Sequence, residues 1–187
     1  SDEINLNHPS SPTGLTGDCD GIAGNGTQPI CVFGGDPTDS DTVIINDVDS
    51  ATAMTFAPVS LDSGTVGGVQ ADNVAVFTTE LVRIDGRSGD DVLTITTPAL
   101  LDDVHFFPLV PGNAGSVRFK RVALADQLLL PMDFVNIEAS VGALVFANAG
   151  GLRQDNLIYH GRDLANSAEF FRVDGAAAGG AGEIRLQ

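Results

Sequence analysis

Several residue types are scarce in this chain. Its 187 residues include no tryptophan, a single tyrosine (Tyr159), a single lysine (Lys120) and two cysteines. Only 9 basic residues stand against 25 acidic ones, which gives a net charge of −16. A surface of this sign excludes binding to the phosphate backbone of nucleic acids, because that binding requires a basic face. No apolar run approaches the ~20 residues that cross a bilayer, so the sequence predicts no membrane span.

Glutamate is also scarce, although the chain is strongly acidic. Aspartate accounts for 20 of the 25 acidic residues. Glutamate favours helices, whereas aspartate favours turns and caps. No segment keeps the apolar period of a helix for long, and the closest candidates are residues 123–130 and 163–171. Both observations favour an all-β chain.

Sequence motifs for catalysis and metal binding are missing as well. The three histidines, His8, His105 and His160, lie far apart in the sequence and show no metal-ligand spacing. Neither a GxSxG nucleophile motif nor a phosphate-binding P-loop is present. We therefore predict that the chain is not an enzyme.

What the chain does contain is a series of short β-branched or aromatic runs separated by Gly, Asp and Asn turns. A loop-rich N-terminal segment, residues 1–40, is expected to precede a β domain over residues 41–187. In that domain a Gly/Ala-rich spacer (175–182) leads to a terminal strand. The runs that predict strands are residues 4–6, 30–33, 43–45, 74–77, 81–84, 92–95, 117–124, 128–130, 134–137, 144–146, 157–159, 170–173 and 184–186.

Three stretches share one nine-residue frame: GGVQADNVA (67–75), GRSGDDVLT (86–94) and GGLRQDNLI (150–158). The glycines allow a turn to enter positive φ, the aspartate accepts from turn amides or holds a cation, and the aliphatic residue opens a strand. Repetition of this unit predicts a chain that winds, with a period of about 20–21 residues between aspartates. We expect an irregular parallel β-solenoid (β-helix), with a β-sandwich as the alternative.

One of these stretches carries a family resemblance. Residues 77–95, FTTELVRIDGRSGDDVLTI, follow the plan strand, Gly-rich turn, Asp, strand. The segment resembles the degenerate hemolysin-type (RTX-like) repeats of large secreted and cell-surface bacterial proteins. In that family the turn aspartates and neighbouring carbonyls bind calcium between stacked turns of a parallel β-roll. The resemblance makes Asp72, Asp90, Asp91 and Asp155 candidate calcium ligands. The other interpretation is that each aspartate caps its own turn.

The two cysteines, Cys19 and Cys31, lie 12 positions apart in the loop-rich N-terminal segment. They have no histidine partner for zinc, and their spacing is not that of a CxxC redox motif. We predict a local disulfide between them, which implies export to the extracellular space or the cell surface. Asp18 and Asp20 flank Cys19 and form a second candidate calcium site inside the disulfide-closed loop.

These observations favour a structural extracellular module: a surface-layer, adhesin or filament subunit that self-associates and is locally ordered by calcium. The alternative is a carbohydrate-binding module, although the lack of tryptophan leaves few stacking platforms. A lesser alternative is a β-helix enzyme that acts on polysaccharide. Its carboxylate chemistry is expected near Arg83, Asp85, Arg87, Asp90 and Asp91.

Overall fold

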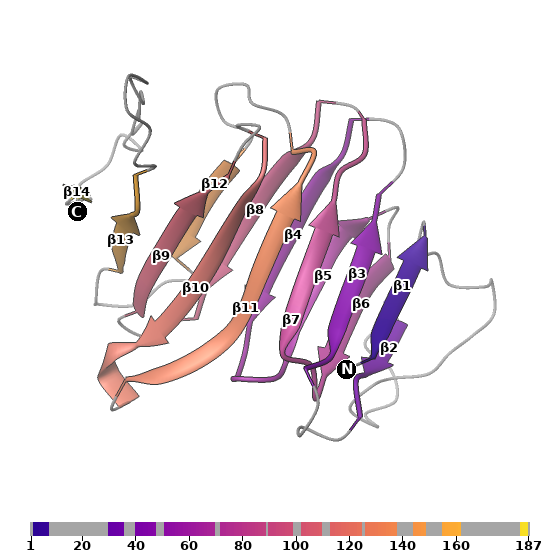
Figure 1. Cartoon of the computed structure of the whole chain (residues 1–187), viewed down its shortest axis with the longest axis horizontal. Coiled ribbons are helices and arrows are strands. Elements are labelled where there is room, and N and C mark those ends of the chain that lie inside the picture. Colours follow the sequence, from indigo (N-terminus) through magenta and orange to yellow (C-terminus); the bar gives the residue numbers. More distant parts are fainter. Residues whose placement is uncertain are drawn as a thin grey trace.

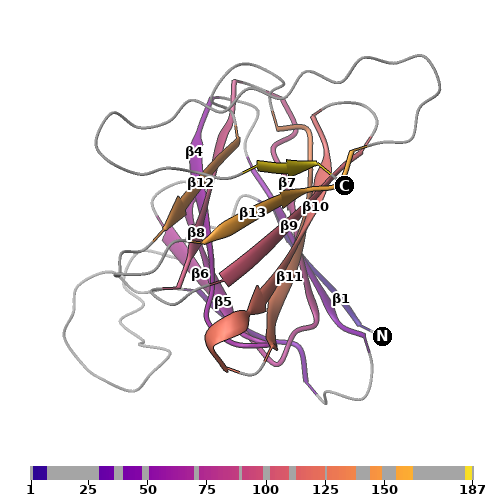
Figure 2. The same ribbon diagram turned by 90° about the vertical axis from the view of Figure 1, so that its left-hand side faces the viewer.

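The chain is all-β in the computed structural model. The structure describes residues 2–7, 30–35, 40–47, 51–69, 72–88, 90–98, 102–109, 113–124, 126–137, 144–148, 155–161 and 184–186. These residues form fourteen strands and one short 3₁₀ turn, η1 (Val122–Leu124). The strands make two sheets that lie face to face, as Figures 1 and 2 show.

The larger sheet has eight strands and the smaller one six. In spatial order the larger sheet contains β1 (Glu3–Asn7), β3 (Thr42–Asn46), β7 (Leu81–Asp85), β11 (Gln127–Val135), β10 (Gly115–Arg121), β9 (Asp102–Pro108), β13 (Asn156–Tyr159) and β14 (Ile184–Leu186). The smaller sheet contains β12 (Leu144–Asn148), β8 (Val92–Thr97), β4 (Ala53–Pro58), β5 (Gly64–Val69), β6 (Asp72–Phe77) and β2 (Ile30–Phe33).

A single strand runs against the others in each sheet. In the larger sheet β10 is antiparallel to both of its neighbours, β11 and β9, and in the smaller sheet β5 is antiparallel to β4 and β6. All other pairings between the described strands are parallel. The chain passes from one sheet to the other and makes two three-strand excursions within a sheet, β4–β5–β6 and β9–β10–β11. Parallel neighbours are therefore distant in sequence.

Three pairs of neighbouring parallel strands share one spacing in sequence, whereas the β2–β6 pair, with Ile30 opposite Val74, has an offset of 44 residues. Glu3 lies opposite Thr42, and Thr42 lies opposite Leu81, which is an offset of 39 residues both times. The same offset of 39 separates Ala53 and Val92 in the smaller sheet. Neighbouring strands are thus about twice as far apart in sequence as the predicted 20–21-residue period, because the chain visits both sheets before it returns.

The core between the sheets follows from the two-residue alternation of the strands. On β7, Val82 and Ile84 are buried, while Arg83 points to the outer face. Phe56 of β4 and Phe119 of β10 meet across the two sheets with ring centroids 6.1 Å apart. The largest fully buried side chains are Phe56, Phe119, Ile45, Met54, Ile84, Leu93, Ile95, Leu129, Leu130, Met132 and Ile137.

The predicted strands correspond to nine of the described strands of the β domain in whole or in part, and to β1 and β2 in the N-terminal segment. The closest helix candidate, residues 123–130, is not a helix: η1 ends at Leu124, and β11 begins at Gln127 and buries Leu129 and Leu130. Strands β4, β5 and β9 were not predicted. The other helix candidate, residues 163–171, the strand predicted over 170–173 and the spacer over 175–182 lie outside the described residues.

Candidate functional site

Acidic residues that immediately precede strands accept hydrogen bonds from the neighbouring parallel strand. We call each of these contacts an acid–amide link. The donor is the backbone N–H of the residue that holds the same position at the start of the neighbouring strand. The four links run from Asp2 to Asp41 (2.8 Å), from Asp41 to Glu80 (2.6 Å), from Thr52 to Asp91 (3.0 Å) and from Asp102 to Asp155 (3.1 Å).

Each link extends the backbone ladder by one hydrogen bond. In the β4–β8 pair, Val92 N–H donates to the carbonyl of Thr52, and Thr52 N–H in turn donates to the Asp91 carboxylate. The β3–β7 pair repeats this, because Leu81 N–H donates to the carbonyl of Asp41. The backbone N–H at the start of a strand would otherwise lack a protein acceptor. It donates instead to the acidic side chain at the start of the neighbouring parallel strand.

In the nine-residue frame, the glycine leaves room for the aspartate side chain. A Cβ on Gly86 would lie 2.6 Å from Asp91 Oδ2 and 2.6 Å from the carbonyl oxygen of Asn136. Gly34 stands in a similar relation to Asp41, since a Cβ there would lie 3.2 Å from Asp41 Cβ. Because glycine has no side chain, the carboxylate that accepts from the neighbouring strand can occupy the space where a Cβ would lie.

The candidate calcium ligands are dispersed. Asp91 is fully buried and Asp155 half-buried, and both bind protein donors, whereas Asp90 is exposed. Asp72 begins β6. Within the described ranges, no three His, Cys, Asp or Glu side chains come together to hold a metal ion. Asp18 and Asp20 lie outside the described residues, so calcium binding stays a prediction.

Only one of the two cysteines in the predicted disulfide lies within the described residues. Cys31 lies on β2, and no free thiol is found in the part of the chain that the structure describes. Cys19 lies outside the described residues. The pairing of Cys19 with Cys31 therefore stays a prediction.

Asp102 has the most perturbed carboxyl group of the described residues that titrate. It is fully buried, and neither of its oxygens has a hydrogen-bond partner within the described chain. The pKa of Asp102 is raised to about 6: burial is the largest cause, the nearby charge of Asp155 adds to it, and Arg121 opposes both effects. Arg121 Nε lies 3.6 Å from Asp102 Oδ1, which is an ion pair without a hydrogen bond.

The pKa of the Asp91 carboxyl group is also raised, but less than that of Asp102. Burial raises its pKa, the hydrogen bonds from Thr52 lower it, and the charges of Asp47 and Asp90 raise it. The Thr52 hydroxyl also donates to Asp47, and the Thr97 hydroxyl donates to Asp155 in the corresponding corner. Thr52 thus lies between two acidic side chains, Asp47 and Asp91, whereas Thr97 contacts one, Asp155.

Two histidines that the sequence separates are brought together by the β9–β13 pairing. His105 Nδ1 lies 2.9 Å from His160 Nε2, and the ring of Phe107 stacks on His160 with centroids 4.0 Å apart. No sequence pattern predicts this contact, because the residues are 55 positions apart and their strands pair through tertiary structure.

A polar groove of about 370 Å³ runs over the outer face of the larger sheet, across β1, β3, β7 and β11. The residues that line it are Asn5, Ile44, Asn46, Arg83, Asp85, Leu109, Asp133, Phe134 and Val135. Arg83 and Asp85 of the predicted polysaccharide-active cluster line this groove, whereas Asp90 and Asp91 do not. Arg87 donates to Asn7 instead. The structure therefore divides the predicted cluster between two places.

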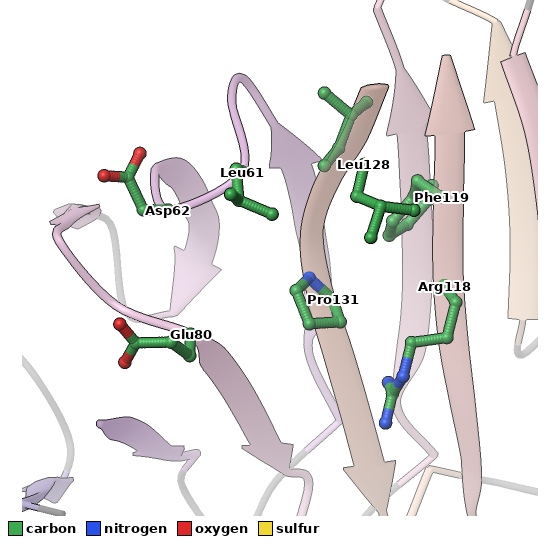
Figure 3. Close-up of a pocket in the computed structure, with 8 residues that line it drawn as sticks. Leu61, Asp62, Glu80, Arg118, Phe119, Leu128 and Pro131 are labelled. Atoms are coloured by element: carbon green, nitrogen blue, oxygen red, sulfur yellow. The ribbon is translucent and has the colours of Figure 1, made fainter. Parts of the chain in front are cut away.

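A second hollow, of about 300 Å³, is apolar and lies beside the β4–β5 turn. Leu61 and Leu128, which are 55% and 57% exposed, form its upper part in Figure 3, and Pro131 lies below them. Asp62, Glu80 and Arg118 place charges around it. Nothing in the described chain occupies this hollow.

Removal of one acid–amide link is expected to destabilise the fold. Asp91→Ala leaves Thr52 N–H without its buried acceptor, so we expect a loss of about 1–3 kcal/mol in the free energy of unfolding at pH 7. The neighbouring Asp90→Ala removes an exposed carboxylate and should change stability by less than about 0.5 kcal/mol. Urea unfolding followed by circular dichroism measures both, and equal effects would contradict the structural role of Asp91.

Asp102 is expected to make stability depend on pH. Because its folded pKa is about 6 and its unfolded pKa is about 3.9, the folded state binds the proton more tightly. The stabilisation by protonated Asp102 is complete below about pH 4 and is lost as the pH rises through 6. Asp102→Asn should therefore be more stable than the wild type above pH 6, by about 2–3 kcal/mol, and should lose this advantage toward pH 4.

The control for this experiment is Asp126→Asn, which removes a 59% exposed carboxylate from a surface ion pair with Lys120. We expect it to change stability by less than about 1 kcal/mol at every pH. A difference between Asp102→Asn and the wild type that does not vary with pH would rule out the raised pKa of Asp102.

Among the described residues, no helix has the length and apolar character needed to cross a membrane.

Comparisons with known proteins identify no relative. The likeness of residues 77–95 to hemolysin-type repeats rests on those residues alone. No protein-family model, no curated protein and no solved structure matches the chain.

Proposed function

We propose that the chain is a structural extracellular module built as a parallel β-solenoid with two antiparallel insertions, and that it is extended at the open ends of its sheets. The observation that carries this proposal is the parallel stacking of sequence-distant strands in both sheets, with one 39-residue offset shared by the pairs β1–β3, β3–β7 and β4–β8. The acid–amide links join the same strand pairs. Coils joined in this way form a rod that another coil of the same type can continue.

The two sheets leave open edges at the same end of the molecule. Strands β1 and β2 lie together at one end in Figure 1, and each is paired on one side only within the described chain. Phe33 on β2 is 61% exposed and stacks on Phe77, with ring centroids 5.1 Å apart. Unpaired edge N–H and C=O groups are templates for further strands. An exposed aromatic ring beside such an edge supplies apolar area for the contact.

At the opposite end of the molecule, both sheets also end in a strand that is paired on one side only within the described chain. There β12 is the edge of the smaller sheet and β14 the edge of the larger one, and Val145 of β12 is 38% exposed. One end of a molecule that meets the other end of a second copy forms a head-to-tail contact, which continues into a filament. A net charge of −16 opposes side-by-side aggregation of such rods. Calcium at Asp18, Asp20 or the frame aspartates would reduce this repulsion locally.

The edge contact can be tested with one pair of charged substitutions. Phe33→Lys places a charge on the edge strand β2, whereas Val59→Lys places the same charge at a residue of equal exposure, 58%, on the β4–β5 turn. We expect the wild type and Val59→Lys to associate as concentration rises, and Phe33→Lys to stay monomeric, because an edge charge blocks strand addition.

Light scattering and negative-stain electron microscopy measure this association, with and without a calcium chelator. Circular dichroism checks that both variants remain folded. A wild-type chain that stays monomeric at every concentration would argue against the proposal, as would equal association of the two variants. Loss of association in chelator alone would support the calcium component.

A second function, carbohydrate binding, is favoured by the groove on the outer face. Arg83 Nη2 lies 3.8 Å from Asp133 Oδ2, which is beyond hydrogen-bond distance, and their side chains are 43% and 21% exposed. A vicinal diol of a sugar fits between a donor and an acceptor placed in this way. Ile44 and Val135 give the groove an aliphatic floor. Because the protein carries a charge of −16, the polysaccharide is expected to be neutral.

The groove is tested by removing its arginine. Arg83→Gln should weaken binding to a neutral polysaccharide by about tenfold or more, which corresponds to ~1.4 kcal/mol. Lys120→Gln removes a positive charge from the same sheet outside the groove and should leave binding unchanged. Affinity electrophoresis against a panel of soluble polysaccharides measures both. Failure of the wild type to bind any of them would exclude this second function.

A further inference from the structure

The rings of His105 and His160 meet end to end. Their facing nitrogens are 2.9 Å apart, their centroids are 5.2 Å apart and their planes are inclined by 24°. A ring nitrogen lies about 1.1 Å from the centroid of its imidazole, so both centroids and both nitrogens fall close to one line. An N–H group of one ring therefore points directly at the lone pair of the other, which is good hydrogen-bond geometry.

The contact lies at the end of the β9–β13 ladder. Four residues of β13 pair with β9, and His160 N–H continues the ladder by donating to the carbonyl of Phe106 at 2.8 Å. Phe107 stacks on His160 at 4.0 Å and holds the ring over β9. At the other end of the ladder, Asn156 donates to Asp103 at 2.8 Å. Together with the acid–amide link from Asp102 to Asp155, the histidine pair is therefore one of three polar side-chain contacts between these strands in the described chain.

Two imidazoles that share one hydrogen bond respond unequally to successive protons. The first added proton goes to the outer nitrogen of the donor ring, so the shared N–H···N bond remains and becomes charge-assisted. The second proton must occupy the accepting nitrogen. Both facing nitrogens then carry N–H, the bond is lost, and two positive rings face each other. The second proton therefore binds less readily than the first, and the two steps belong to the pair rather than to either ring.

The charged groups around the two histidines leave the second protonation unfavourable. Burial lowers the pKa of His105 most, followed by the charge of His160, while Asp103 on the same strand raises it and Lys120 on β10 lowers it. Arg118 lies opposite His105 on β10 and adds a further positive charge. The carboxylate of Asp103 accepts from Asn156, and that of Asp133 binds Arg118.

We propose that His105 and His160 form a pH-sensitive clasp that holds β13 on β9. The clasp is closed while the pair carries at most one added proton, and it opens when both rings are charged. Since a histidine with a lowered folded pKa stabilises the fold above its unfolded pKa, this stabilisation is lost as the pH falls below about 6.5. Release of β13 leaves β9 as the edge strand of the larger sheet.

Hydrogen exchange at single amides tests the clasp. After correction for the intrinsic pH dependence of exchange, protection of Ile158 and His160, whose amides face β9, should fall at least about tenfold between pH 7.5 and pH 5, a change equivalent to one pKa unit. Amides of β3 and β7 should keep their protection. In His160→Gln, whose side chain does not titrate, this pH dependence of β13 should disappear. His8→Gln is the matched control and should behave as the wild type.

Three results would overturn the clasp: equal protection of β13 at both pH values, the same acid opening in His160→Gln as in the wild type, or an equal loss of protection on β3 and β7. If His160→Gln does not fold, nitrogen-15 shifts of the wild-type rings decide instead. Two well-separated steps, with one below the ordinary histidine pKa, support the clasp, whereas two independent and equal titrations refute it.

Discussion

The hydrogen bond between a strand-entry amide and a carboxylate on the neighbouring parallel strand is the interaction on which this architecture depends. A parallel sheet whose neighbours are 39 residues apart receives no help from local turns in setting its register. The acid–amide links supply that help. A one-residue slip of β3 against β7 would separate Asp41 N–H from Glu80 and would also turn Val43 and Ile45 out of the core.

Burial of carboxyl groups beside these links has an electrostatic cost. Asp91, which accepts in a link, and Asp102, which donates its backbone N–H in another, are fully buried, and burial raises the pKa of both side chains. A protein that only required solubility would leave its aspartates in water, where Asp90 lies. The placement of Asp41, Asp91 and Asp155 beside amides of the neighbouring parallel strand accounts for part of the aspartate excess without calcium.

Local sequence rules predicted the strands with alternating β-branched and aromatic residues, such as β7 and β8. They failed where another constraint was stronger. Residues 123–130 contain helix-forming leucines and alanine, yet Gln127 begins a strand because Leu129 and Leu130 complete the core between the sheets. Strand β5 is rich in glycine, since a Cβ on Gly67 would lie 2.7 Å from Thr55 Oγ1 of the adjacent strand. A pattern based on β propensity therefore misses it.

The sequence by itself determined the all-β character, the corners where glycine and aspartate recur, and the absence of a basic face, because each of these follows from residue type or from short-range spacing. Tertiary structure alone decided which strands are neighbours. It separated Asp90 from Asp91 in function, joined Arg83 to Asp133, and brought His105 to His160 across 55 residues. These contacts depend on parallel pairing between distant segments, and no local pattern encodes the partner of a strand.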